Sequence, residues 1–180
     1  MNGDLIVLNE HLYGAMKLPA EDRTTSTHIA TMKPGEPVAK GAGGAPQPDG
    51  NFMFLMLTGD PEDGTDLFTG IVKEESTETS TVDGEVNVHL VGLATRLRGK
   101  ATTAANVNTK AKFAALVLDC VTFDGISAAT GNTTTTPYTI DEDEGSDPNV
   151  HGLQMLVCDI ETGLLEVRVV AGTNFLGNGI

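Results

Sequence analysis

Hydrophobic residues after position 50 fall into short runs separated by polar turn clusters, a pattern typical of the strands of a mainly β domain. The run Phe52–Leu57 is continuous and apolar, which predicts a buried strand, and Phe68–Val72 predicts another. Residues Glu85–Val91 alternate between apolar and polar side chains. A period of two predicts a half-buried strand with Val86, Val88 and Leu90 on the buried face.

The clearest supersecondary pattern lies near the C-terminal end of the chain. Two apolar segments, Leu153–Ile160 and Leu164–Val170, are joined by the turn Glu161–Gly163. Two strands separated by a short turn that contains glycine predict a β-hairpin. The glycine-bounded strand at Glu85–Val91 loosely resembles the second strand of this hairpin, so two similar β units are one interpretation.

Two other segments carry mixed signals. Residues Lys110–Leu116 are good helix formers, whereas the next residues, up to Phe123, favour a strand through their β-branched content. Residues Ala128–Asn149 predict a long loop region with one edge strand around Pro137–Ile140. The whole pattern therefore predicts a mainly β fold with at most one or two short helices.

The first fifty residues differ from the rest. A short apolar run is followed by a polar, threonine-rich passage, and residues 41–50 contain four glycines and two prolines, which fit neither a helix nor a central strand. We predict an extended N-terminal arm and linker over residues 1–50, and a β-rich domain over residues 51–180. A disordered terminus is the alternative, but several apolar side chains predict that the arm docks on a partner. These residues are Leu5, Ile6, Val7, Leu8, Leu12, Tyr13 and Met16.

Charge and composition narrow the function classes. Eleven Lys and Arg residues stand against 25 Asp and Glu residues, which gives a net charge of −14. Such an acidic surface repels a phosphate backbone, so we expect no nucleic-acid partner. Tryptophan is absent and other aromatic residues are few, which removes the usual stacking platforms for sugars and single strands.

Two cysteines and the first residues of the chain bear on its compartment. Cys120 and Cys158 each lie within an apolar run, which favours two buried free thiols and a reducing, cytoplasmic site of synthesis. The first residues carry Asp4 and Glu10 and lack the basic start of a secretion signal. No apolar stretch approaches the length of a membrane span, so we expect no membrane partner.

One short motif suggests catalysis. The string from Asp159 through Glu161 to Gly163 resembles the opening motif of a family of two-metal exonucleases, in which an Asp-x-Glu pair binds the metal ions. Only 17 residues follow Gly163, and Glu166 is the sole acid among them. The turn of a hairpin explains the string at least as well. A small metal-dependent hydrolase that uses Asp159 and Glu161 remains an alternative.

Three basic residues form a local cluster in this acidic chain: Arg96, Arg98 and Lys100. Their alternate spacing puts all three on one face if the segment is extended. Two interpretations stay open, a solvated strand face and a contact with an acidic surface of a partner or a neighbouring subunit.

The remaining polar clusters assign no catalytic, metal or cofactor site. The acidic run Asp141–Asp147 lacks glycine where a calcium-binding helix-loop-helix motif requires it, and so does Asp60–Thr65, which favours solvated loops. The histidines are scattered and show no zinc-ligand spacing. We therefore expect a binding or structural protein without cofactor or catalytic residues.

Three passages resemble the head decoration (capsid cement) proteins of tailed phages: Gly35–Gly41, Phe68–Val72 and Asp83–Val107. The resemblance implies a β-barrel or β-tandem-like body, usually a homotrimer, that binds the phage major capsid protein on the outer surface of the virion. It also implies synthesis in the host bacterial cytoplasm and an N-terminal arm that reaches across neighbouring coat subunits. The alternative within the same class is another phage structural part, such as a tail-tube or fibre-associated protein.

Overall fold

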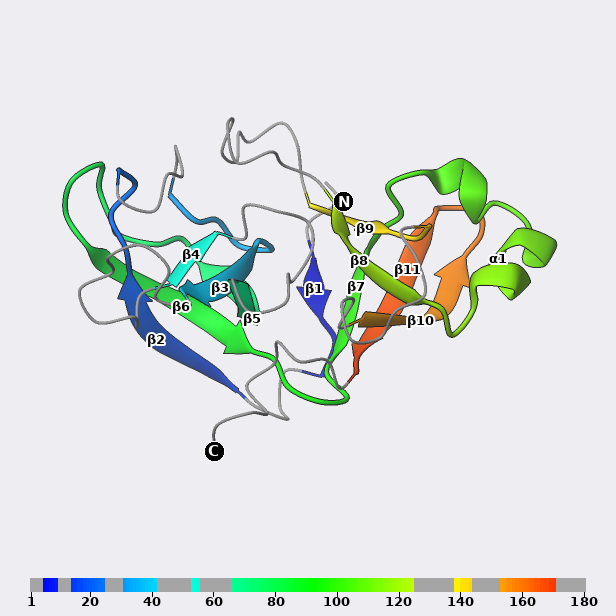
Figure 1. Ribbon diagram of the computed structural model, residues 1–180, viewed down its shortest axis with the longest axis horizontal. Helices are drawn as coiled ribbons and strands as arrows, with labels where there is room; N and C mark the ends of the chain where they lie inside the picture. Colours follow the sequence, from blue (N-terminus) through cyan, green and yellow to red (C-terminus); the bar gives the residue numbers. More distant parts are fainter. Residues whose placement is uncertain are drawn as a thin grey trace.

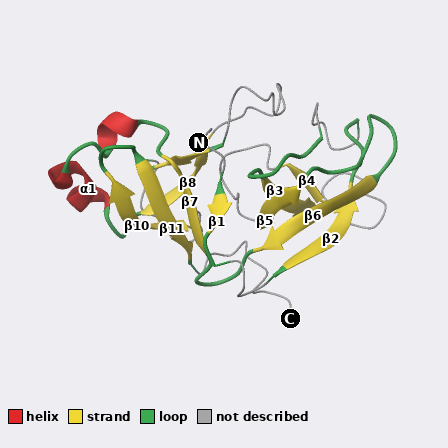
Figure 2. Ribbon diagram, turned by 180° about the vertical axis from the view of Figure 1, so that it is seen from behind, coloured by secondary structure: helices red, strands yellow, loops and turns green. Residues whose placement is uncertain are grey.

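Two β-sheets make up the body of the protein (Figure 1). One is a closed barrel with the strand order β2-β4-β3-β5-β6, and the other is a six-stranded sheet with the order β1-β7-β11-β10-β8-β9. Figure 2 shows them side by side, with the helical segment at the far end of the second sheet. The computed structural model describes residues 5–9, 14–24, 31–41, 53–55, 66–124, 138–143 and 153–170.

The barrel encloses a small aliphatic core. Its strands are β2 (Ala15–Ala20), β3 (Pro37–Gly41), β4 (Met53–Leu55), β5 (Asp66–Glu74) and β6 (Gly84–Leu90). The alternation predicted for the last of these is confirmed, because Val86 and Val88 are buried in the core with Met32 and Val72. Burying each such side chain stabilises the fold by about 1.5–3 kcal/mol.

The second sheet curls back on itself. Its strands are β1 (Ile6–Val7), β7 (Arg96–Lys100), β8 (Cys120–Asp124), β9 (Thr139–Asp141), β10 (Leu153–Asp159) and β11 (Leu164–Val169). Ala101, directly after β7, forms a bridge with Ile140 of β9, the last strand of the sheet order. The backbone N–H of Thr102 also donates to the carbonyl of Ile140 at 2.9 Å. These contacts curve the sheet around its apolar side chains.

The C-terminal hairpin and the short helix are confirmed. Strands β10 and β11 pair antiparallel, and their turn closes with a 2.8 Å hydrogen bond from the N–H of Gly163 to the carbonyl of Asp159. Gly163 has a φ of +68°, a conformation that glycine adopts without the strain of a Cβ. Helix α1 (Lys110–Leu116) begins after Thr109, whose side chain accepts a hydrogen bond from the N–H of Lys112.

One apolar core joins the two sheets. Phe68 of β5 packs in the same cluster as Phe123 of β8 and Leu97 of β7. Tyr138, just before β9, is buried in this cluster. Its burial and the nearby carboxylate of Glu36, just before β3, raise the pKa of Tyr138. The fold is therefore a small mainly β body in which the barrel and the curled sheet share a core, as the sequence pattern predicts.

The prediction of an arm separate from the body is wrong for the described part of residues 1–50. Strand β1 pairs with β7, β2 pairs with β6, and β3 pairs with β5, so three strands from this region are built into the two sheets. The sequence pattern hid them because β2 contains Pro19 and β3 begins at Pro37, and proline argues against a strand. Of the predicted linker, residues 41–50, Gly41 ends β3 and residues 42–50 lie outside the described residues.

Candidate interaction surface

Residues of β7 and β11 alternate between the core and the outside of the curled sheet. Leu97 of β7 and Leu165 and Val167 of β11 point into the core and are fully buried. Because successive strand residues face opposite sides, the residues between them are displayed outward. The predicted basic cluster at Arg96, Arg98 and Lys100 therefore lies on one face of an extended strand, and Glu166 and Arg168 lie on the same face of the next strand.

Strand register arranges these outward residues in three rows, which together we name the outer face. In an antiparallel pair, residues directly opposite each other project to the same side of the sheet. The first row is Ile6, Arg98, Glu166 and Val157; the second is Arg96, Arg168 and Gln154; the third is Lys100, Leu164 and Asp159.

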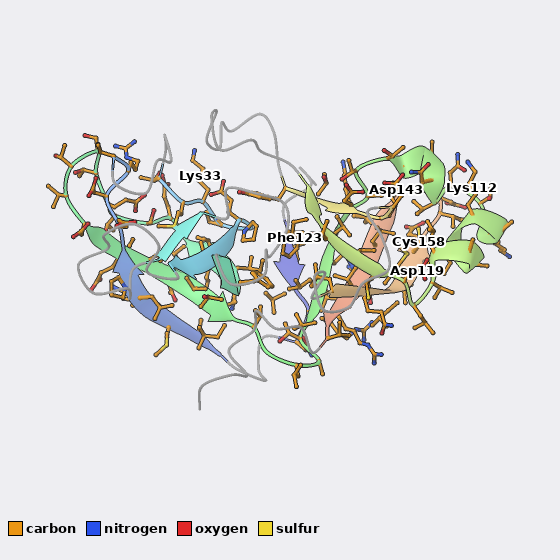
Figure 3. The ribbon with its side chains drawn as sticks, in the orientation of Figure 1. Lys33, Lys112, Asp119, Phe123, Asp143 and Cys158 are labelled. Carbon is orange, nitrogen blue, oxygen red and sulfur yellow. The ribbon has the colours of Figure 1, made fainter. Side chains whose placement is uncertain are left out.

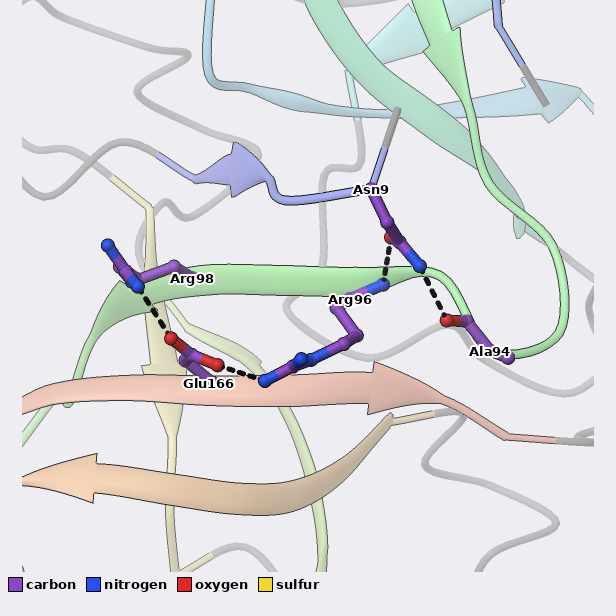
Figure 4. A network of polar contacts seen from close by, with 5 residues as sticks. All are labelled: Asn9, Ala94, Arg96, Arg98 and Glu166. Atoms are coloured by element: carbon purple, nitrogen blue, oxygen red, sulfur yellow. Dashed lines mark hydrogen bonds and ion pairs between the residues drawn. The ribbon is translucent and has the colours of Figure 1, made fainter. Parts of the chain in front are cut away.

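Glu166 binds two arginines of the neighbouring strand (Figure 4). The Nη2 atom of Arg98 donates to Oε1 of Glu166 at 2.6 Å, and Nη2 of Arg96 contacts the other carboxylate oxygen. The side chain of Glu166 is only 17% exposed, and the hydrogen bond from Arg98, together with the charge of Arg96, lowers its pKa although burial opposes the shift. One carboxylate thus holds two guanidinium groups in fixed positions on the surface.

Arg168 is held by a neutral group. Its Nε and Nη2 atoms donate to the amide oxygen of Gln154 at 2.9 and 2.6 Å. Arg168 also lies directly opposite Arg96, and like charges at such positions destabilise a sheet. Lys100, at the end of β7, is exposed as well. The outer face therefore concentrates positive charge at some cost to folding, which favours a role in binding.

Strand β1 is fastened to β7 by main-chain and side-chain hydrogen bonds. The N–H of Leu8 donates to the carbonyl of Arg96 at 2.8 Å. The side chain of Asn9 accepts a 2.7 Å hydrogen bond from the N–H of Arg96 and donates a 3.1 Å hydrogen bond to the carbonyl of Ala94 (Figure 4). A single amide side chain therefore fixes the end of β1 against the start of β7.

The structure divides the residues predicted to dock on a partner. Leu5 is 2% exposed and belongs to the protein's own core, so its prediction as a docking residue is wrong. Val7 and Leu8 are half-buried, whereas Ile6 and Met16 are 43% and 49% exposed. Leu12 and Tyr13 lie outside the described residues.

No family model, curated protein or solved structure matches the chain. Within the described ranges, no helix is long and apolar enough to cross a membrane. A functional proposal therefore rests on the sequence resemblance and on the surface residues of the chain itself.

The Asp-x-Glu string forms the hairpin turn. The carboxylate of Asp159 accepts hydrogen bonds from the backbone N–H groups of Glu161 and Thr162, at 3.0 and 3.4 Å. Hydrogen bonds from the side chain of Thr162 and the backbone of Glu161 lower the pKa of Asp159. Within the described part of the chain, no three His, Cys, Asp or Glu residues converge as metal ligands would. The turn geometry thus accounts for the residue types in this string.

The start of the acidic loop is tied into the fold. Glu142 is buried and accepts hydrogen bonds from the N–H of Thr103 at 3.1 Å and from Nδ2 of Asn106 at 3.0 Å. Nδ2 of Asn106 also donates to the carboxylate of Asp143 at 2.8 Å (Figure 3). These carboxylates hold the short 3-10 helix Ala104–Asn106 against β9. Residues 144–147 and the second acidic run at 60–65 lie outside the described residues.

The two cysteines are free thiols. Cys120 is buried, as its apolar surroundings predict, whereas Cys158 is half-buried. Burial, and then the negative charges of Asp159 and Glu142, raise the pKa of Cys158 (Figure 3). A raised pKa keeps this thiol protonated and weakly reactive at neutral pH.

Sequence reasoning missed three residues of the outer face, Gln154, Glu166 and Arg168, and also Asn9, which fastens β1 to β7. The alternation in Leu164–Val169 could have placed Glu166 and Arg168 on one face. Their pairing with the basic cluster depends on the register between β7 and β11, which a single sequence does not reveal.

Proposed function

We propose that this chain is a head decoration protein of a tailed phage, which binds the outer surface of the capsid and stabilises the shell. The sequence resemblance supports this function through three passages. In the fold they contribute to the turn before β3 and β3 itself, to β5, and to the segment from β6 through β7. The resembling passages therefore contribute to three of the five barrel strands and supply β7, one of the four strands of the outer face.

The exposed side chain of Ile6 on β1 is the observation that carries the proposal. Strand β1 is the first in the order of its sheet, and Ile6 is 43% exposed in the row that holds Arg98 and Glu166. The side of β1 away from β7 faces the barrel, where the N–H of Leu5 donates to the carbonyl of Gly35 at 3.1 Å (Figure 1). The exposed side chain of Ile6 is therefore what β1 offers a partner, as an apolar anchor. We infer that Ile6 contacts the coat protein.

Repetition of the coat subunits favours such a mode of binding. A shell presents many equivalent sites, so a decoration protein with several contact points gains avidity from modest individual contacts. The acidic chain, with its net charge of −14, also avoids non-specific association with nucleic acid. Stabilisation then follows from linking neighbouring coat subunits.

Substitution of Ile6 tests the proposal. Removing residues 1–20 would delete β2 from the closed barrel, so a point variant gives a cleaner answer. We expect Ile6→Asp to bind expanded capsids at least about tenfold more weakly, because burying such a side chain contributes roughly 1.5–3 kcal/mol. The control is Leu118→Asp, which changes another exposed apolar residue away from β1. Undiminished occupancy by Ile6→Asp would overturn the proposal.

A further inference from the structure

The outer face carries a charge opposite to that of the chain as a whole. Four of the 11 Lys and Arg residues lie on it, Arg96, Arg98, Lys100 and Arg168, against two acids, Glu166 and Asp159. Two apolar side chains, Ile6 and Val157, are more than 40% exposed in the same set of rows. A basic surface with exposed apolar residues fits an acidic protein surface with its own apolar residue.

Such an acidic surface lies on the barrel, in residues 73–85. This segment contains the end of β5, the connection to β6 and the start of β6. Five of these 13 residues are acidic, and Lys73 is the only basic one. We name the exposed acids of this segment the acidic strip; they are Glu74, Glu75, Asp83 and Glu85. Val82, which belongs to the same segment, is 60% exposed.

Hydrogen bonds from neutral donors hold two carboxylates of the strip. Oε2 of Glu74 accepts from the side chain of Asn87 at 3.0 Å, and Oδ1 of Asp83 accepts from the backbone N–H of Asp22 at 3.0 Å. Neutral donors orient these two groups without cancelling their charge. Glu85 differs, because Nζ of Lys17 lies 3.3 Å from its carboxylate in an exposed ion pair that solvent screens. Glu74 and Asp83 thus present oriented negative charge in the segment that carries the exposed Val82.

The two surfaces lie on different sheets and cannot meet within one molecule. Figure 1 shows the connection between β5 and β6 at one end of the molecule, whereas β7, β11 and β10 lie in the opposite half. The complement of each surface must therefore come from another molecule.

We propose that copies of this chain associate head to tail, with the outer face of one copy against the acidic strip of the next. The apolar residue Val157 of one copy then lies near Val82 of its neighbour, and Ile6, at the other end of the same row, remains available to the coat protein. A contact between two different patches of the same chain is heterologous, so successive copies form a ring or a filament. A second copy fits better than another acidic protein because the complementary patch is already present on the chain.

This inference specifies the surfaces for the self-association that the decoration function implies, and in that sense it rests on the proposed function. Its test needs no capsid, because association occurs in solution. Wild-type protein that associates but does not bind capsids would contradict the proposed function alone, and wild-type protein that binds capsids but stays monomeric in solution would contradict the inference alone.

Charge reversal on each surface, followed by light scattering, tests the contact. Lys100→Glu with Arg168→Glu reverses the outer face and spares the two arginines that bind Glu166. A glutamate at 168 lies opposite Arg96, so the fold tolerates it. Glu74→Lys with Glu75→Lys reverses the strip. The control Lys110→Glu with Lys112→Glu, on helix α1, makes the same change in net charge as the outer-face variant.

We expect wild-type protein at low salt to have a mass above that of the 18.8 kDa monomer, and to dissociate as salt rises from about 50 to about 500 mM. Reversing either surface raises the dissociation constant at least about tenfold, since like charges replace opposite ones. The control variant associates like wild type, and the chain with all four reversals on the two surfaces recovers association. A monomeric wild type, an equal loss in the control, or no recovery would each overturn the inference.

Discussion

Phe68 and Phe123 meet edge to face, with their ring centroids 5.1 Å apart and their planes at 72°. One ring belongs to β5 of the barrel and the other to β8 of the curled sheet. Edge-to-face pairs at this separation are more favourable than their buried area alone suggests. The pair therefore joins the two sheets within the core that they share.

Removing either ring should destabilise the whole protein. Phe68→Ala or Phe123→Ala leaves a cavity in the shared core, so we expect the free energy of unfolding in urea to fall by about 3–5 kcal/mol. The double variant should show a coupling of about 0.5–1.5 kcal/mol between the two rings. Phe113→Ala, at the partly buried edge of the same cluster, is the control and should cost less.

A single unfolding transition is the second part of this prediction. If the shared core couples the barrel and the sheet, both lose structure together in every variant. Two separate transitions in wild-type protein, or additive effects of the two phenylalanine substitutions, would show that the sheets are independent.

Gly99 of β7 makes room for β1. A Cβ at this position would lie 2.7 Å from Cδ2 of Leu5 and 3.1 Å from Cδ1 of Ile140. We expect Gly99→Ala to lower the free energy of unfolding by about 1–3 kcal/mol through overpacking, and to speed amide exchange at Leu8, whose N–H donates to β7.

A second substitution, at Leu5, should offset part of the destabilisation caused by Gly99→Ala. Leu5→Val removes the end of the side chain that the new methyl group meets, so Gly99→Ala with Leu5→Val should be more stable than the sum of the two separate effects predicts. Strict additivity, or unchanged exchange at Leu8 in Gly99→Ala, would argue that Leu5 does not set the packing here.

Much of the fold follows from local patterns in the sequence. The alternation in Glu85–Val91 and the glycine turn at Gly163 sufficed for β6 and the hairpin, and Lys110–Leu116 forms the predicted helix. Strands β2 and β3 were not predicted because each contains a proline, and they are held in place by pairing with β6 and β5. Pairing between distant segments leaves little trace in a short window of sequence.

The candidate surface was predicted in part. Alternate spacing placed Arg96, Arg98 and Lys100 on one face, which the strand confirms. The sequence could not indicate that Glu166 binds Arg96 and Arg98, which lie 70 and 68 residues before it in the chain. These contacts depend on the register between β7 and β11. Leu5 was misassigned because an apolar run at an N-terminus looks the same whether it docks on a partner or on its own core.

The two hydrogen bonds that the Asn9 side chain makes to Ala94 and Arg96 should control the local stability of β1. We expect Asn9→Ala to speed amide exchange at Leu8 and Arg96, because it removes two hydrogen bonds worth about 0.5–1.5 kcal/mol each. Asn108→Ala, at an exposed asparagine away from β1, is the matched control. Equal exchange at Arg96 in wild type and Asn9→Ala would show that the main chain alone holds β1.

The ion pairs of Glu166 should make stability depend on pH. Hydrogen bonds from Arg98 and the charge of Arg96 lower the pKa of Glu166 below its ordinary value of 4.5 in the folded state. A group with a depressed folded pKa contributes stability that is fully present above the unfolded pKa and is lost as pH falls through the folded pKa. We therefore expect Glu166→Gln to lower the free energy of unfolding by about 1–2 kcal/mol at neutral pH, an amount reduced by solvent screening of the exposed arginines.

The difference between Glu166→Gln and wild type should shrink as the pH is lowered to about 3, because protonation removes the same charge from the wild-type carboxylate. Urea unfolding at several pH values measures this difference. Glu161→Gln removes a charge from the same hairpin away from the two arginines, and should change stability by less than about 0.5 kcal/mol. If the free energies of unfolding of wild type and Glu166→Gln differ by the same amount at both ends of the pH range, the Glu166 side chain stabilises β11 by packing and not by charge.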